Sequence, residues 1–313
     1  MNACISNRPV TLTLFFAILL LLLTSSVTLA QSAPIPDSFD AQYVLGPDSQ
    51  SRSGVPEGRV MEFTLANSKT FPGFEHHWWL YVPAQYQGKR RISLMVFQDG
   101  QNYVSSSGEW RVPIVLDNLI AKKELPLMAA VFINPGVRHS MASDGSSVQV
   151  ESNRSLEYDT LSPAYATFLV DEILPEVRKH VRITDDPSGR GIAGRSSGGI
   201  CAFTVAWQRP DQFRRVLTFN GSFVDIRGGH VYPDLVRQSE RKLLRVFLQD
   251  GIRDVVGEYA SLSWPEGNKA MAAALSQKGY EHQFVLGEGT HSAKHGASIF
   301  PDAMRWLWRG HPR

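Results

Sequence analysis

The feature that most constrains the fold is an alternation of short apolar runs with helical patterns along most of the 313-residue chain. The runs are rich in β-branched and aromatic residues and most stop at Gly, Pro, Asn or Asp, as strands do. They cover 60–65, 78–82, 92–97, 129–133, 191–193, 216–219, 244–248 and 284–286, with helical patterns at 164–181, 198–207, 268–278 and 297–308. This alternation predicts one α/β domain, in which a mostly parallel central sheet carries helices on both faces.

Residues 1–30 are expected to lie outside this domain. Arg8 is their only charged residue, and residues 14–23 form an unbroken apolar run. Small and polar residues then lead to Ala30, which is the layout of a secretory signal peptide cleaved after Ala30. The run is shorter than the roughly 20 residues that a spanning helix needs. The sequence therefore predicts a secreted or periplasmic protein without stable membrane insertion, and an uncleaved anchor is the alternative.

The rest of the chain is expected to consist of an irregular lead-in over 31–56, rich in Ser, Pro, Gly, Asp and Gln, and one domain over 57–313. The 32 basic and 30 acidic residues give a net charge of +2, which offers no footprint for nucleic acid. Cys201 would be the lone thiol after the signal is removed, and its apolar neighbours favour a packing role. The oligomeric state is left open by the sequence.

The most informative motif is Gly194-Arg-Ser196-Ser197-Gly198, a G-x-S-x-G match between an apolar strand and a helical pattern. In a nucleophile elbow the serine occupies a sharp strand-to-helix turn, and glycines let the strand and the helix approach closely. Ser196 is therefore the predicted nucleophile, and the N–H of Ser197 is a predicted oxyanion donor. The alternative is a Gly/Ser turn that only closes a strand–helix unit.

A serine nucleophile needs a base and an orienting acid, which in this architecture follow in the order Ser, acid, His. Asp254, in the loop after the strand 244–248, is favoured as the acid over Asp250, which is placed to cap the turn at Gly251. His291 follows the last strand and is the predicted base, whereas His295 is expected to pack or to support it. No HExxH or cysteine set accompanies this pair, so neither a metal nor another cofactor is expected.

A second oxyanion donor is expected where an early strand ends. The strand 92–97 runs into Gln98-Asp99-Gly100, so the N–H of Gly100 or Gln101 would supply this donor, with an ordinary Asp-Gly turn as the alternative. The candidates for substrate contact are Arg154, Tyr158, His230 and Trp264. Capping a helix and pinning its loop is the favoured role for the first two of these, and packing is the alternative for the tryptophan.

Several sequence blocks, in one order, resemble the esterase D and enterochelin-esterase-like family of α/β-hydrolases. They are YVPAQY (81–86), MVFQDGQNYV (95–104), FINPG (132–136), RSLEYDTLS (154–162), IAGRSSGGICAF (192–203), RGGHVYP (227–233), FLQDGIRD (247–254) and GTHSAKHG (289–296). The family includes ferric enterobactin esterases, the feruloyl and acetylxylan esterases of carbohydrate esterase family 1, and mycolyltransferases. The resemblance implies an α/β-hydrolase fold from about residue 57 to 309 and a Ser-Asp-His triad on Ser196, Asp254 and His291.

The residues and the resemblance together predict an exported serine carboxylic-ester hydrolase that works through an acyl-enzyme. The family implies a small-molecule or glycan ester as substrate, with a carbohydrate-linked acetyl or feruloyl ester preferred. A siderophore lactone is the rival, although siderophore hydrolysis is usually cytoplasmic and this chain carries an export signal. An acyltransferase would use the same triad, and a carbohydrate-binding hydrolase-like domain would have a broken one.

Overall fold

The computed structural model describes Met1 and residues 39–312, apart from the side chain of Ala260, so nearly all of the expected signal peptide lies outside the described residues. Within them, eight strands form one sheet in the order β1-β2-β4-β3-β7-β8-β9-β10. Their bounds are β1 Arg59–Leu65, β2 His76–Val82, β3 Ser93–Gln98, β4 Met128–Ile133, β7 Arg190–Arg195, β8 Arg215–Phe219, β9 Arg245–Gly251 and β10 Glu281–Gly287. Only the β1–β2 and β2–β4 pairs of this sheet are antiparallel. The predicted mostly parallel sheet is therefore confirmed.

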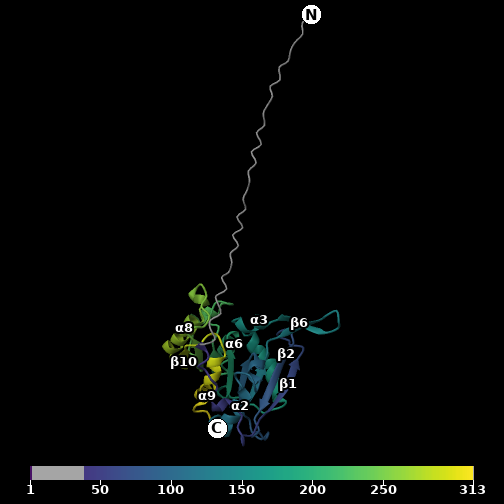
Figure 1. Cartoon of the computed structure of the whole chain (residues 1–313), viewed down its shortest axis with the longest axis vertical. Coiled ribbons are helices and arrows are strands. Elements are labelled where there is room, and N and C mark those ends of the chain that lie inside the picture. The colour runs from purple at the N-terminus through teal and green to yellow at the C-terminus, as the bar shows by residue number, and fades with distance from the viewer. Residues whose placement is uncertain (2–38, 313) are drawn as a thin grey trace. The chain divides into compact units, whose positions relative to one another are not determined.

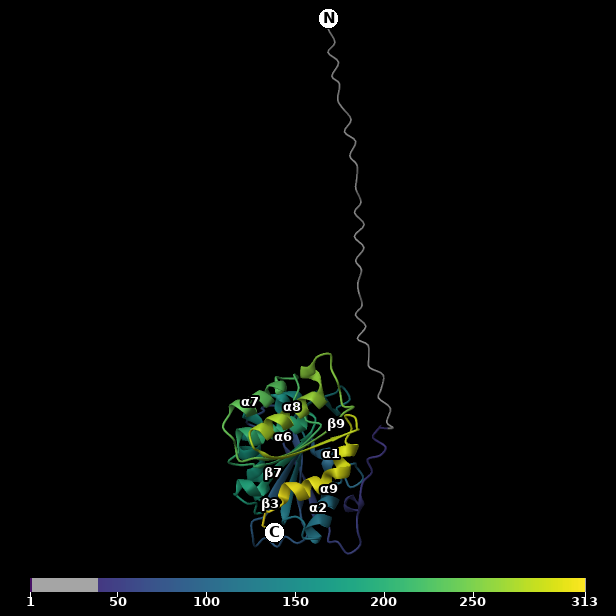
Figure 2. The ribbon, with the colours of Figure 1, turned by 90° about the vertical axis from the view of Figure 1, so that its left-hand side faces the viewer.

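Helices cover both faces of the sheet (Figures 1 and 2). One face packs against α3 Arg154–Asp159, α4 Ala164–Phe168, α5 Leu174–Arg178, α6 Ser197–Gln208, α7 Tyr232–Gln238 and α8 Trp264–Gln277. The other face packs against α1 Gly100–Val104, α2 Val112–Ala121 and α9 Lys294–Trp308. Since successive strand residues point to opposite faces, each buried strand supplies side chains to two separate cores.

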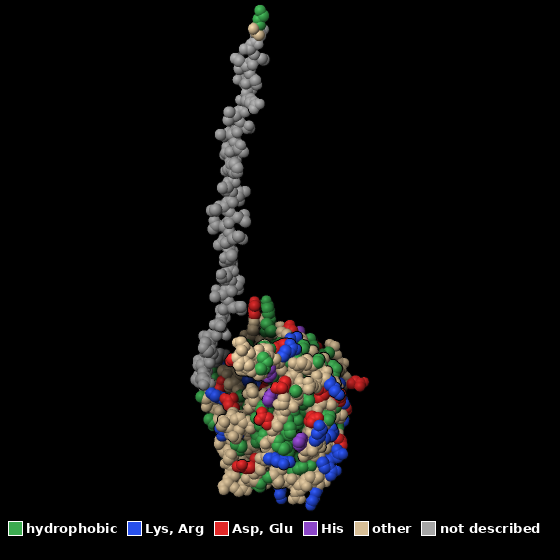
Figure 3. Space-filling model, turned by 90° about the vertical axis from the view of Figure 1, so that its right-hand side faces the viewer, with side chains coloured by type: hydrophobic (Ala, Val, Ile, Leu, Met, Phe, Trp, Pro, Cys, Tyr) green, Lys and Arg blue, Asp and Glu red, His purple; other side chains and the backbone are tan. Residues whose placement is uncertain are grey.

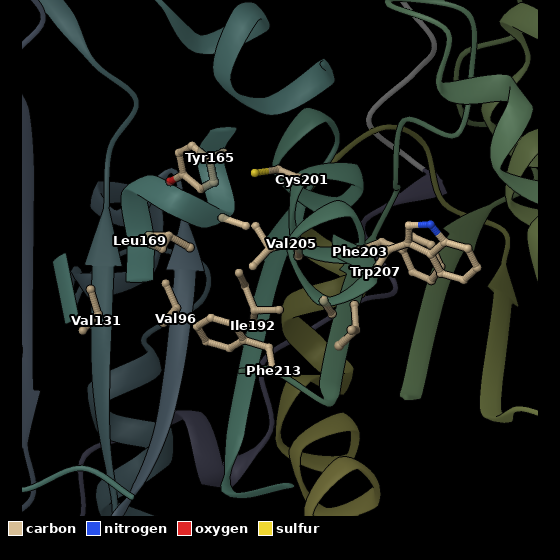
Figure 4. Close-up of a cluster of buried hydrophobic side chains, with 14 of the residues drawn as sticks. Val96, Val131, Tyr165, Leu169, Ile192, Cys201, Phe203, Val205, Trp207 and Phe213 are labelled. Atoms are coloured by element: carbon tan, nitrogen blue, oxygen red, sulfur yellow. The ribbon is translucent and has the colours of Figure 1, made fainter. Parts of the chain in front are cut away.

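Figure 4 shows the first of these cores, in which Val96, Val131 and Ile192 from the strands lie beneath helical side chains such as Leu169 and Val205. Each fully buried aliphatic or aromatic side chain of this kind contributes about 1.5–3 kcal/mol to stability. Cys201 is buried in the same core, in the packing role that its apolar neighbours favour, and burial raises the pKa of its thiol well above the ordinary value.

The helix predicted over 164–181 is present but interrupted. A π-helical segment, Leu169–Ile173, separates α4 from α5, and α5 ends at Arg178. Pro175 stands in the first turn of α5, where it has no N–H to donate and its ring crowds the carbonyl four residues earlier. The wider π turn accommodates this proline without breaking the helix.

Residues 39–58, which precede β1, are irregular and include a 3₁₀ turn at Pro47–Ser49. Further 3₁₀ turns lie at Pro187–Gly189, Gly229–Val231 and Ala260–Leu262. The lead-in is nevertheless part of the domain, because residues 39 onward form one compact unit and both Asp40 and Ser49 are buried.

A hairpin that the sequence analysis did not predict, β5 Val137–Met141 with β6 Ser147–Ser152, projects from the domain (Figure 1). The edge strand β1 lies on the side seen in Figure 3, where acidic and basic side chains are interspersed. Its exposed residues include Arg59 and Glu62, whose charges disfavour pairing with another sheet edge. No helix among residues 39–312 is long and apolar enough to cross a membrane.

Candidate active site

Ser196 occupies the sharp turn between β7 and α6. Its backbone angles, φ 57° and ψ −125°, are strained for a residue other than glycine. The turn is held because the Ser196 N–H donates to the Phe219 carbonyl at 2.9 Å and the Ser196 carbonyl accepts from the Ser222 N–H at 3.1 Å. A Cβ at position 194 would lie 2.2 Å from the carbonyl oxygen of Gly198, so glycine is required there. This is the geometry of a nucleophile elbow.

His291 joins Ser196 to Asp254 in one chain of hydrogen bonds. Its Nε2 lies 2.9 Å from the Ser196 Oγ, and its Nδ1 lies 2.6 Å from the Asp254 Oδ1. The three residues follow β7, β9 and β10, and because these strands run parallel, their carboxyl ends bring the residues to the same end of the sheet. When Nδ1–H donates to Asp254, Nε2 is left as an acceptor for the serine proton.

Asp254 is 2% exposed and is surrounded by donors. Burial by itself would raise the pKa of Asp254, but hydrogen bonds, that from His291 foremost, hold the pKa below its ordinary value. The backbone N–H of Val255 and the Asn220 Nδ2 also donate to this carboxylate, at 2.5 and 2.8 Å. An ionised carboxylate in this place can fix the tautomer of the imidazole and stabilise the imidazolium.

Among the described residues, neither alternative, Asp250 or His295, is hydrogen-bonded to Ser196 or to the His291 imidazole. Asp250 accepts the N–H of Gly251 at 2.8 Å, which is the capping contact that its position favoured. His295 is buried, stacks on Tyr43 with ring centroids 4.1 Å apart, and has its Nδ1 3.0 Å from the Gln249 Nε2. Desolvation lowers the pKa of His295. This histidine therefore packs at the start of α9 as a neutral residue.

The expected oxyanion donors lie at two helix starts. Ser197 and Gly100 are the first residues of α6 and α1, so their N–H groups have no acceptor within the helix. Gln101 instead donates its N–H to the Asn134 Oδ1 at 3.0 Å, and its side-chain Oε1 accepts from the Asn134 Nδ2 at 3.2 Å. A substrate oxygen could accept the Gln101 N–H only by sharing this N–H with the Asn134 Oδ1 or by displacing the Asn134 side chain.

A cavity of about 850 Å³ opens beside Ser196 and His291. Its other wall is mainly polar and comes from Asp99, from α1 and the loop after it, from Asn134, from the hairpin and from the start of α3. Arg154 lies in that wall and forms a two-pronged ion pair with Asp99, through its Nε and Nη2 at 2.8 Å each.

The other three candidates for substrate contact do not line this cavity. Tyr158 is fully buried and accepts the N–H of Asp99 at 3.1 Å, a contact that fits the favoured loop-pinning role. His230 is exposed in the turn before α7 and lies 3.1 Å from Asp225. Trp264 packs edge-on against His291, with ring centroids 5.5 Å apart, and donates to the Ser222 Oγ at 3.2 Å. The tryptophan therefore supports the histidine from outside the cavity.

Two contacts that the sequence analysis missed hold the loop of His291. Arg195, the residue before Ser196, donates from Nη1 to the His291 carbonyl at 2.8 Å. Asp40, in the lead-in, accepts both the N–H of Thr290, at 3.0 Å, and its hydroxyl. The place of Arg195 inside the G-x-S-x-G motif is a signal that could have identified it, whereas Asp40 stands in a stretch without periodicity.

Within residues 39–312, no group of three or more His, Cys, Asp or Glu side chains is arranged to hold a metal ion.

Comparison with known proteins gives a family and a fold. The model of the family described as "Putative esterase" matches residues 70–307. The iron(III) enterobactin esterase of Dickeya dadantii (strain 3937) is 29% identical over 248 residues, which cover 74% of this chain and 51% of that protein. This chain thus spans about half the length of that curated relative.

Two solved structures show the same fold. The enterobactin esterase of Shigella flexneri superposes with a TM-score of 0.66 at 21% identity, over 84% of this chain and 61% of that one. A ferulic acid esterase of Anaeromyces mucronatus superposes with a TM-score of 0.64 at 16% identity, over 88% and 96% of the two chains. These likenesses confirm the α/β-hydrolase fold.

Proposed function

The chain belongs to the esterase family, and from that premise we propose that it is an exported serine carboxylic-ester hydrolase that forms an acyl-enzyme on Ser196. The observation that carries the proposal is the hydrogen-bond chain from the Ser196 Oγ through His291 to Asp254. Hydrolase folds that only bind a ligand have no need of this chain, so it favours an enzyme over a carbohydrate-binding domain.

In the proposed reaction His291 Nε2 takes the hydroxyl proton while the Ser196 Oγ bonds to the carbonyl carbon of the ester. The carbonyl oxygen becomes an oxyanion, held by the N–H of Ser197 and that of Gly100 or Gln101. The carbon–oxygen bond to the alcohol then breaks, and His291 returns the proton to the departing alkoxide. Water repeats the cycle against the acyl-enzyme and releases the acid, with Asp254 orienting the imidazole throughout.

A carbohydrate-linked acetyl or feruloyl ester is the substrate that we propose. The polar wall and the volume of about 850 Å³ suit a hydroxyl-rich alcohol better than a long apolar acyl chain. The family likeness to a ferulic acid esterase points the same way. The export that we propose rests on the pattern of residues 1–30, which ends at Ala30.

A siderophore lactone is the second candidate. Two guanidinium groups, those of Arg154 and Arg195, line the cavity and would suit acidic aromatic groups, and the Dickeya and Shigella relatives are enterobactin esterases. An acyltransferase would differ only in admitting a second alcohol in place of water.

The test is a substrate panel on the mature chain and on its Ser196→Ala variant. The panel contains p-nitrophenyl esters of increasing acyl length, acetylated and feruloylated sugars, and a catechol-bearing serine lactone. We expect sugar esters to give the highest kcat/KM, and Ser196→Ala to lower turnover about 10⁴- to 10⁶-fold without a change in fold. A preference for the lactone would favour the second candidate, and full activity in the variant would contradict the elbow assignment.

A further inference from the structure

Asp250 is the penultimate residue of β9 and lies next to Asp254, the acid of the proposed triad. It is fully buried. Amides and a backbone N–H surround its carboxyl: the Asn220 Nδ2 at 3.0 Å and the Gly251 N–H at 2.8 Å on Oδ1, and the Asn268 Nδ2 at 2.9 Å on Oδ2. Capping the turn uses only one of these contacts, so it does not account for the rest.

Asn220 ties Asp250 to Asp254. The same Nδ2 that lies 3.0 Å from Asp250 Oδ1 lies 2.8 Å from Asp254 Oδ2. Asn220 follows β8 with a left-handed φ of 45°, a strained conformation that asparagine tolerates better than most residues. The shared amide holds the two carboxyl groups close together, so that Asp254 raises the pKa of Asp250. Two ionised carboxylates so close in a buried site repel each other strongly, which favours a proton on one of them.

The surroundings decide which one. Asp254 faces His291 and the N–H of Val255, which stabilise a negative charge. Among the described contacts at the Asp250 carboxyl, Asp254 is the one charged group, because the side chains of Asn220, just after β8, and of Asn268, in α8, contribute neutral amides. Burial and the neighbouring Asp254 therefore raise the pKa of Asp250 far above its ordinary value.

We propose that Asp250 is a positioning residue of the esterase, a protonated carboxylic acid that donates a hydrogen bond to Asp254 and so extends the chain Ser196–His291–Asp254 by a fourth member. This inference rests on the proposed triad. The donated bond fixes the carboxylate that orients His291, and it keeps a second negative charge out of the buried loop.

The chain offers a matched pair of variants. Asp250→Asn stays neutral and keeps an N–H donor of the same shape, so it should lower kcat/KM less than about threefold. Asp250→Ala removes the donor and should lower kcat/KM about 10- to 100-fold, mainly through kcat. The wild type should also lose activity at alkaline pH as Asp250 ionises, and that limb of the kcat/KM profile should be absent from Asp250→Asn.

Stability supplies a readout that does not depend on catalysis. The folded protein keeps the Asp250 proton and the unfolded chain releases it, so the free energy of unfolding of the wild type falls as the pH rises between the two pKa values. Asp250→Asn removes this dependence. Its melting temperature should therefore rise relative to the wild type between about pH 5 and pH 8.

The outcomes separate this inference from the proposed function. Labelling of Ser196 by a serine-directed phosphonate in the wild type and in both variants tests the triad, and its failure in the wild type would overturn the proposed function itself. With labelling intact, equal losses in folded Asp250→Asn and Asp250→Ala would show that the residue must be ionised. A melting-temperature difference between wild type and Asp250→Asn that is constant with pH would contradict the bound proton.

Discussion

The two walls of the cavity are held in different ways. The strand-end wall is made by Ser196 and His291, with Asp254 buried behind the histidine; these residues follow β7, β10 and β9 of the parallel part of the sheet and are joined by hydrogen bonds. The hairpin wall is formed by Asp99, which directly follows β3, by Arg154 of α3 and by the β5–β6 hairpin, so most of it lies outside the central sheet. The hairpin exposes nearly all its side chains, including Met141, Val148 and Val150. Under the proposed function, chemistry rests on the sheet scaffold, whereas substrate recognition falls to a segment that can vary without disturbing that scaffold.

The sharpest way to break this comparison is to remove the base from the strand-end wall. We expect His291→Ala to lower turnover about 10⁴- to 10⁶-fold, because members of one triad act as a unit. His295→Ala is the matched control, since His295 packs in the same segment but contacts Tyr43 and Gln249. The His295→Ala variant should have a lower melting temperature but a turnover close to that of the wild type. A larger loss of kcat in His295→Ala, measured on folded protein, would move the base to that residue.

Replacing the acid should have the next largest effect. Asp254→Asn preserves the shape of the side chain but favours the wrong histidine tautomer, so turnover should fall about 10⁴-fold, as in the serine-protease case. The measurement is kcat/KM for the variant beside its melting temperature. A folded Asp254→Asn protein with near wild-type turnover would show that Asp254 does not orient His291.

The sequence allowed these residues to be predicted because strand ends leave a local signal. Apolar runs that stop at Gly or Asp located Ser196, Asp254 and His291, and parallel pairing brought them to one edge. The hairpin was missed because its strands are exposed on both faces, so no apolar alternation marks them. Asp40 was missed for a related reason: its contact with Thr290 joins segments 250 residues apart, which no local pattern records.

The lead-in offers an intermediate test, since it supports the strand-end wall from outside the sheet. Asp40→Ala should lower kcat about 10- to 100-fold, because releasing Thr290 lets the imidazole of the next residue shift from its position. Asp48→Ala is the matched control in the same lead-in, because Asp48 pairs with Arg305 and Lys122, which do not line the cavity. If both variants lower melting temperature and neither changes kcat, the lead-in only stabilises the fold.

The smallest effect is expected on the hairpin wall. Arg154→Ala breaks the ion pair with Asp99 and should raise KM for sugar esters about tenfold with kcat nearly unchanged. Arg138→Ala, which removes an exposed pair with Glu151 on the hairpin, should leave both constants as they are. A fall in kcat for Arg154→Ala with KM unchanged would assign this arginine to the strand-end wall instead.

The central proposal, an acyl-enzyme on Ser196, is tested most directly by trapping the adduct. The mature protein is mixed with excess p-nitrophenyl acetate, quenched in acid within the first turnover, digested and mapped by mass spectrometry. We expect a burst of one p-nitrophenol per active site and an acetyl group on the peptide that carries Ser196, with neither in Ser196→Ala or His291→Ala. Turnover without a burst and without an adduct, or an acetyl group on another residue, would contradict the proposal.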